Sequence, residues 1–166
     1  MAKKLTASGQ QLKPDPVYKS KLVSKFINTM MWQGKKSVVQ KIFYDAMNII
    51  EKKMKESGGQ GTTEAPGMLE VFETAVNNVK PLLEVRSKRI GGASYQIPMQ
   101  VKPSRQQSLA FRWIIQSARG KKGSAFCERL AAELMDAYGG HGGAMTTRDN
   151  VHKMAEANKA FAHFAW

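Results

Sequence analysis

Three kinds of side chain in this sequence could carry chemistry: histidines, a single cysteine and a regular series of arginines. The histidines are His141, which lies among glycines, and His152 and His163, which are eleven residues apart. No Asp, Glu or Cys is spaced to form a catalytic triad or a metal site with them. Cys127 stands alone, which excludes a disulfide framework, and we expect it to pack as a small hydrophobe. The sequence therefore predicts no catalytic residue, no metal and no cofactor.

The arginines recur at a spacing that suits phosphate binding. Arg105, Arg112 and Arg119 are seven residues apart, so on a helix they drift by only about 20° per heptad and share one face. We expect this face to point away from the core residue Trp113. Three guanidiniums in a row would bind the phosphates of A-form RNA bidentately, and the alternative is a set of ordinary surface arginines. Two lysines extend the face beyond the predicted helix: Lys121 and Lys122.

A second basic group lies near the turn of a predicted β-hairpin, residues 80–101. Alternating apolar and polar residues flank Gly91 and Gly92, a pair that tolerates the positive φ of a tight turn. Two arms of eight residues would reach about 25 Å, whereas a domain of this length has a radius of gyration of about 15 Å. We therefore expect the hairpin to protrude freely into a partner; the alternative is a hairpin folded down on the helices. The residues near its tip are Arg86, Lys88, Arg89 and Tyr95.

Lysines near the start of the chain give a weaker signal. Lys35 and Lys36 follow a glycine at a turn between two predicted helices. The upstream glycine and the preceding strand of a phosphate-binding P-loop are missing, so the turn is not of that kind. Lys3 and Lys4 belong to residues 1–18, which lack periodicity and are expected to form an extended arm.

The charge distribution indicates a polyanionic partner. The 166 residues include 26 Lys and Arg against 13 Asp and Glu, a net charge of +13. Residues 80–122 hold one acid, Glu84, among many bases, whereas residues 61–79 hold glutamates and no base. Self-repulsion on this scale opposes compaction unless a polyanion is bound. An anionic membrane is the alternative to nucleic acid, but no window approaches about 18 apolar residues and the first ten residues do not resemble a secretory signal, so we expect no membrane partner.

The scaffold that positions these residues is predicted to be helical. Hydrophobic residues make up 42% of the chain, enough for a core. They recur at helical spacing in six segments. The predicted fold class is mainly α: a single domain, residues 1–166, of about six helices with one protruding two-stranded antiparallel β-hairpin.

Local signals predict where some of these helices begin. Ser37 with Gln40, and Ser104 with Gln107, match the capping box, in which the first side chain caps a helix N-terminus. The last helix is expected to begin near Thr147. The residues expected on its inward face are Val151, Met154, Ala155, Phe161 and Ala162.

Motifs that follow one another along nearly the whole chain resemble the bacterial small-subunit ribosomal protein S-seven family. They are Pro14-Asp15-Pro16, Lys25-Phe26-Ile27-Asn28, Gly34-Lys35-Lys36-Ser37, Val79-Lys80-Pro81, Glu84-Val85-Arg86-Ser87, Gly91-Gly92-Ala93, Tyr95-Gln96-Ile97-Pro98, Arg105-Gln106-Gln107-Ser108-Leu109-Ala110, Met154-Ala155-Glu156-Ala157-Asn158 and Phe161-Ala162-His163. The family's fold, a helical domain with a protruding β-ribbon, agrees with the prediction from the residues.

The resemblance implies binding to the 3′ major domain of small-subunit ribosomal RNA early in assembly, and organisation of the head. It also implies a place at the subunit interface near the exit-site tRNA and the messenger RNA path, with ribosomal proteins nine and eleven as neighbours. The expected ribosomal RNA-binding residues are Lys3, Lys4, Lys35, Lys36, Arg105, Arg112, Arg119, Lys121 and Lys122. Those expected near tRNA and messenger RNA are Arg86, Lys88, Arg89, Tyr95, Arg148 and Lys153.

Two other classes of protein compete with this interpretation. A DNA-binding, nucleoid-type protein would present Arg, Asn or Gln from the first turn of a recognition helix, as Arg105, Gln106 and Gln107 could. An RNA-modifying enzyme would need a cofactor loop or a nucleophile, and the sequence offers neither. We expect a protein of the ribosome, in the cytoplasm, or in an organelle matrix if it is organelle-encoded.

Overall fold

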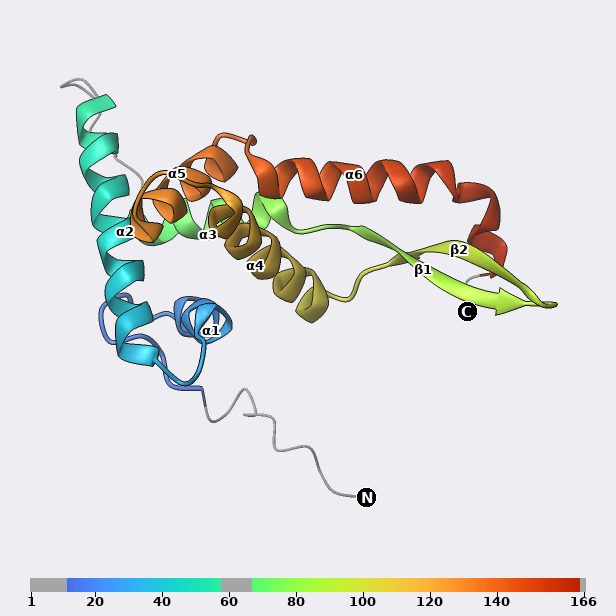
Figure 1. Ribbon diagram of the computed structural model, residues 1–166, viewed down its shortest axis with the longest axis horizontal. Helices are drawn as coiled ribbons and strands as arrows, with labels where there is room; N and C mark the ends of the chain where they lie inside the picture. Colours follow the sequence, from blue (N-terminus) through green and yellow to red (C-terminus); the bar gives the residue numbers. More distant parts are fainter. Residues whose placement is uncertain (1–11, 58–66, 165–166) are drawn as a thin grey trace, which may run out of the picture.

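The computed structural model describes residues 12–57 and 67–164. It is mainly helical with one antiparallel β-hairpin, which confirms the predicted fold class. In chain order the elements are α1 (Lys21–Met30), α2 (Lys36–Ser57), α3 (Met68–Val79), β1 (Leu83–Ile90), β2 (Ala93–Gln100), α4 (Pro103–Gly120), α5 (Phe126–Tyr138), α6 (Gly143–Ala157) and the 3₁₀ helix η1 (Lys159–Phe164). Figure 1 shows α1–α5 packed together, while α6 and the hairpin run away from them side by side. We call α1–α5 the helical body, and the hairpin with α6 and η1 the extension.

Aromatic side chains hold the helical body together. Phe26, Phe43, Phe72 and Phe111 come from α1, α2, α3 and α4 respectively, and all four are buried. The ring centroid of Phe26 lies 5.2 Å from those of both Phe72 and Phe111, in edge-to-face geometry. Such pairs add about 0.5–1.5 kcal/mol each beyond the burial of their area. One aromatic cluster therefore joins four helices and orients the outer face of α4.

Both predicted capping boxes are wrong. Helix α4 begins at Pro103 with Lys102 as its N-cap, so Ser104 lies inside the first turn. Proline at the first helical position sets a helical φ, and it keeps the residue before it extended, which moves the start to Pro103. Helix α2 begins at Lys36, directly after a tight turn, so Ser37 is also inside its helix.

The last helix begins four residues before Thr147, at Gly143. Its start is capped from another helix, because the buried Glu133 of α5 accepts a hydrogen bond from the Ala144 N–H at 2.8 Å. A capping group that comes from a distant part of the chain leaves no local signal in the sequence. Helix α6 ends at Ala157, where the backbone tightens into η1. Of the side chains expected inward, Ala155 is buried, whereas Met154 is 52% exposed and Ala162 is exposed.

The hairpin has the predicted turn but not the predicted isolation. Its register runs from Leu83 opposite Gln100 to Ile90 opposite Ala93, and Gly91 and Gly92 both have positive φ, as a two-residue turn of this type requires. Figure 1 shows the hairpin extending beyond the helical body, with η1 against its outer part. A two-stranded ribbon is marginally stable alone. Packing on the last helical segment explains how this one is supported, so the ribbon protrudes as predicted but does not stand alone.

The segment before α1 is anchored by a buried carboxylate. Asp15 is 2% exposed and accepts hydrogen bonds from the Val17 and Tyr18 N–H groups, both at 3.1 Å. Its other oxygen accepts the Tyr44 hydroxyl at 2.8 Å. The described part of the predicted N-terminal arm is therefore fastened to α2. Lys3 and Lys4 lie outside the described residues.

Candidate nucleic-acid interface

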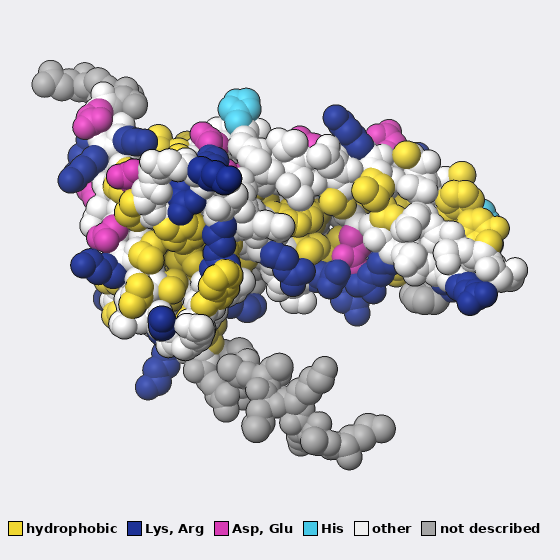
Figure 2. Space-filling model, viewed as in Figure 1, with side chains coloured by type: hydrophobic (Ala, Val, Ile, Leu, Met, Phe, Trp, Pro, Cys, Tyr) yellow, Lys and Arg dark blue, Asp and Glu magenta, His cyan; other side chains and the backbone are white. Residues whose placement is uncertain are grey.

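Lysine and arginine side chains gather on the face of the molecule that Figure 2 shows. Figure 2 shows them in a band over α4 that continues to the base of the hairpin, with a further group at the hairpin's outer end. Exposed side chains of this band include Arg86, Lys102, Arg105, Arg112 and Lys122. The predicted charge cluster is thus a surface of the folded chain. Some of these cations form ion pairs within the protein, and others do not.

The base of the hairpin holds an ionic cluster of two arginines and one carboxylate. Glu84 of β1 has a side chain only 11% exposed, and it accepts hydrogen bonds from the Nε of Arg86 at 2.7 Å and the Nε of Arg105 at 2.6 Å. Both arginine side chains remain about half exposed, at 50% and 49%. Arg105 therefore joins α4 to the hairpin while about half of its side chain stays exposed.

Arg119, at the other end of the arginine series, is also partly engaged. Its Nη2 donates to the Met30 carbonyl oxygen at 2.8 Å, and its guanidinium carbon lies 4.2 Å from the ring centroid of Trp32. Burial lowers the pKa of the Arg119 guanidinium, which stays charged at neutral pH. In the part of the chain that the structure describes, only Arg112 of the three is exposed without an ion pair, hydrogen bond or ring contact.

Lys121 closes the turn between α4 and α5. Its Nζ lies 2.8 Å from an oxygen of the fully buried Glu133 and 3.1 Å from an oxygen of Asp136. Burial lowers the pKa of Lys121, but the hydrogen bonds and negative charges of the two carboxylates outweigh it and raise the pKa above its usual value. Lys121 is thus mainly a structural cation, whereas its neighbour Lys122 is exposed.

Lys35 and Lys36 are exposed at the start of α2. They follow a tight turn in which the Lys35 N–H donates to the Trp32 carbonyl oxygen at 3.0 Å. The first N–H groups of a helix have no partner within it and carry partial positive charge, so a helix start with two lysines favours anions. This pair of lysines was only a weak signal in the sequence. In the structure the two lysines form a surface suited to phosphate.

The cations of the extension fall into two groups. Arg148 donates to the Asn78 carbonyl oxygen at 2.5 Å and pairs with Asp149 at 2.6 Å, so it fastens α6 to α3. Lys88 donates to the Phe164 carbonyl oxygen at 3.4 Å. Arg89, Lys153 and Lys159 are exposed.

Tyr95, expected near tRNA, is packed against the end of the chain. Its ring centroid lies 5.3 Å from that of Phe161 and 5.6 Å from that of Phe164. The Tyr95 ring thus makes internal contacts, and it supports η1 on the hairpin.

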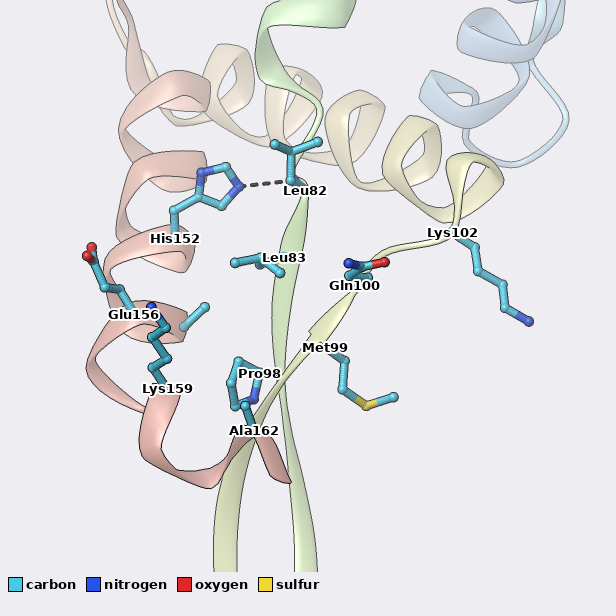
Figure 3. Close-up of a pocket in the computed structure, with 11 residues that line it drawn as sticks. Leu82, Leu83, Pro98, Met99, Gln100, Lys102, His152, Glu156, Lys159 and Ala162 are labelled. Atoms are coloured by element: carbon cyan, nitrogen blue, oxygen red, sulfur yellow. Dashed lines mark hydrogen bonds between the residues drawn. The ribbon is translucent and has the colours of Figure 1, made fainter. Parts of the chain in front are cut away.

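A mostly apolar groove of about 780 Å³ lies where the hairpin leaves the helical body, between the strands and α6. Figure 3 shows Leu82, Leu83 and Pro98 along it, while the side chain of Lys102 points away. His152 of α6 accepts a hydrogen bond from the Leu82 N–H through Nε2 at 3.0 Å. This histidine therefore joins α6 to the hairpin.

Among residues 12–57 and 67–164, no group of three His, Cys, Asp or Glu could hold a metal, and no helix is long and apolar enough to cross a membrane.

Several of these contacts could not be found from the sequence. Arg119 meets Met30 and Trp32 across almost ninety residues, and Glu133 meets the start of α6 from inside α5. Spacing along one helix shows which side chains share a face, but it does not show what approaches that face. The isolated position of Glu84 in a basic stretch was the one available signal, since a lone acid among arginines is suited to pairing.

A helical body with a band of exposed cations and a basic extension is typical of proteins that bind polyanions. The sequence matches the family model described as ribosomal protein S7p/S5e over residues 2–159, and the chain belongs to this family. A relative from a Nitratiruptor species is 52% identical over 157 residues, which are 95% of each chain. One from Natranaerobius thermophilus is 51% identical over 166 residues, 100% of each. A third, from Rhodopirellula baltica, is 52% identical over 163 residues, 98% of this chain and 99% of its own.

All three relatives are called small ribosomal subunit protein uS7. Membership of this family supports a structural role in the small ribosomal subunit, and RNA binding is implied by the family. It places the chain in a class of structural proteins.

Proposed function

We propose that this protein is a primary ribosomal RNA-binding protein that binds the 3′ major domain of small-subunit ribosomal RNA and nucleates assembly of the head. The observation that carries the proposal is the band of exposed cations over α4 and the hairpin base, in a chain of net charge +13. Family membership supports the choice of ribosomal RNA over other polyanions.

In this proposal the exposed cations bind phosphates and the paired cations set their geometry. Arg112, Lys122, Lys35 and Lys36 offer complete side chains to RNA. The half-exposed arginines around Glu84 offer those N–H groups that the carboxylate leaves free. Arg119 and Lys121 act mainly by holding helices in place.

The extension serves a second purpose in the proposal. Two of its exposed cations, Arg89 at the hairpin tip and Lys153 on α6, lie near the exit-site tRNA and the messenger RNA path. Ribosomal proteins nine and eleven are the proposed neighbours, and the ribosome is the proposed location. The support for this part is the family resemblance together with the reach of the extension beyond the helical body.

The test is a binding titration with a transcript of the 3′ major domain of bacterial small-subunit ribosomal RNA, at several salt concentrations. If about 6–10 phosphates are neutralised, the logarithm of the affinity should fall with the logarithm of salt concentration with a slope of about −5 to −9. Double-stranded DNA of equal charge serves as competitor. Preference for the DNA, or a flat salt response, would refute the proposal.

A double substitution locates the interface. Arg112→Gln with Lys122→Gln should reduce the size of the salt slope by about two, because two phosphate contacts are lost. The matched control is Lys53→Gln with Lys55→Gln, which removes two exposed lysines of α2 and should leave the slope nearly unchanged. Equal effects of the two pairs would mean that α4 has no special part in binding.

A further inference from the structure

A tryptophan is held open to solvent beside the start of α2. Trp32 is 68% exposed, the largest side chain among the exposed apolar residues that the structure describes. Scattered exposed apolar residues are normal on a protein surface. Two features distinguish Trp32: a cation lies over its ring, and lysines flank it.

The ring is supported from one side. The guanidinium carbon of Arg119 lies 4.2 Å from its centroid, a distance typical of a guanidinium over an aromatic face. Arg119 is itself held by its hydrogen bond to the Met30 carbonyl oxygen. Because a flat ring has two faces and most of this residue is exposed, the face opposite Arg119 remains open toward solvent. Trp32 is thus oriented by the fold, which reduces the entropy that a ligand stacking on it would have to overcome.

The backbone brings a lysine close to Trp32. The Lys35 N–H donates to the Trp32 carbonyl oxygen at 3.0 Å, across a turn in which Gln33 and Gly34 have positive φ. Residues at the two ends of such a turn have Cα atoms within about 7 Å. Lys35 and Lys36 are exposed, so a flat apolar surface and two cations adjoin one another.

From this arrangement we infer that the open face of Trp32 is a stacking site for one unpaired nucleobase of a single-stranded loop or bulge, with Lys35 and Lys36 binding the adjoining phosphates. The inference rests on the proposed RNA-binding function and adds to it a contact with a base, where the arginines contact phosphates. RNA-binding proteins stack unpaired bases on aromatic rings in this way. Arg119 is then a positioning residue that holds the ring from behind.

The test compares Trp32→Leu and Trp32→Phe with the wild-type chain in binding to the 3′ major-domain transcript. Trp32→Leu keeps apolar bulk but loses the aromatic face, so the affinity should fall by roughly 5- to 150-fold. Trp32→Phe keeps a smaller face and should recover part of the loss. The salt slope should stay unchanged in both variants, because no phosphate contact is removed, whereas Lys35→Gln should reduce its size by about one. The matched control is Val17→Ala, which shortens an apolar side chain that is 60% exposed and should leave the affinity unchanged.

Tryptophan fluorescence gives a second measurement. Stacking on a base quenches the indole, so the transcript should quench the wild-type chain more strongly than Trp32→Phe, in which the two other tryptophans remain. If the wild type binds the transcript and Trp32→Leu binds it equally well, the stacking site is wrong while the proposed function stands. A Trp32→Leu chain that binds RNA normally but fails to enter subunits would assign Trp32 to a protein neighbour and also overturn the inference. If the wild type does not bind the transcript, the proposed function itself fails.

Discussion

The Glu84 carboxylate lies between two guanidinium groups, at the point where β1 leaves the helical body. Arg105 reaches it through Nε, and so does Arg86. A carboxylate in a basic surface weakens the long-range attraction for RNA by one charge. At short range it has the opposite effect, because it orients the two guanidiniums.

The opposite effects of the Glu84 carboxylate at long and short range lead to a prediction for Glu84→Gln. Non-specific affinity for any RNA should rise, because the net charge increases by one, while affinity for the 3′ major-domain transcript should fall, because the arginines lose their orientation. Partly exposed ion pairs are weak, so the free energy of unfolding should fall by only about 1 kcal/mol. Titration of both RNAs and a denaturant melt would measure these effects.

The control for Glu84→Gln is Glu73→Gln, which makes the same change of charge at an exposed position of α3. It should raise both affinities slightly. If Glu84→Gln raises specific and non-specific affinity alike, the carboxylate does not orient the arginines.

The hydrogen bond from Tyr44 to Asp15 leads to a prediction about pH. Burial, with the Asp15 hydrogen bond and charge, raises the pKa of Tyr44 from 10.0 to about 12. The folded state therefore keeps this proton where the unfolded chain has lost it. The stabilisation is complete below pH 10 and is lost as pH rises from 10 to about 12. Tyr44→Phe should cost about 1.5–3 kcal/mol at neutral pH, since the lost hydrogen bond is to a charged group.

Denaturant melts at several alkaline pH values would test this prediction. The decline in stability above pH 10 should be shallower in Tyr44→Phe than in the wild type, because this one proton no longer contributes. Tyr18→Phe is a useful comparison, since burial also raises the pKa of the Tyr18 hydroxyl. Parallel curves for the wild type and Tyr44→Phe would show that the Asp15 contact does not control the titration of Tyr44.

At the level of secondary structure elements, the hairpin and η1 depend on each other. The outer part of the hairpin packs on η1 through Tyr95, and the strand register places Lys88 opposite Tyr95. A shortened hairpin can keep this pair if residues 89–94 are replaced by Asn-Gly, which closes a two-residue turn well. We expect the shortened chain to fold with an unchanged core and to enter small subunits. Its defect should be weaker binding of exit-site tRNA or poorer maintenance of the reading frame.

Purified subunits carrying the shortened hairpin would be assayed for occupancy and for exit-site tRNA affinity. Tyr95→Ala in the full-length hairpin is the matched variant, because it loosens η1 and leaves the basic tip in place. If the shortened chain is absent from subunits, the tip is needed for assembly and the proposed division of labour fails.

An element could be predicted from the sequence where the residues that determine it lie close together in the chain. The helices of the body follow from apolar spacing, and the hairpin turn follows from its two glycines, so both were predictable. The start of α6 was not, because its capping carboxylate comes from α5. The cation positions were visible in the sequence, but their pairing was not: Arg105 and Arg119 have partners on β1 and at the end of α1. Distance along the chain hides such contacts.

For the whole molecule, the net charge of +13 has opposite effects on folding and on binding. Repulsion among the cations destabilises the free protein, and salt screens it over a distance of about 10 Å at 0.1 M. The melting temperature of the free protein should therefore rise by a few degrees as salt increases from low to physiological concentration. Affinity for RNA should fall over the same range. Calorimetry and binding titrations in the same buffers would measure the two trends, and a melting temperature that falls with salt would contradict the first.

The joint between the helical body and α6 has a mechanical consequence. The Glu133 carboxylate accepts the Ala144 N–H and pairs with Lys121, and Gly142 beside it has φ 96°, where a Cβ atom would come within 2.9 Å of the Asp136 Cβ. The fifteen residues of α6 form a rod of about 22 Å, so a rotation of about 10° at this joint would displace its far end by about 4 Å. A small change of angle at this joint thus becomes a large displacement at the other end of α6. The stiffness of the joint therefore determines how precisely that end is positioned.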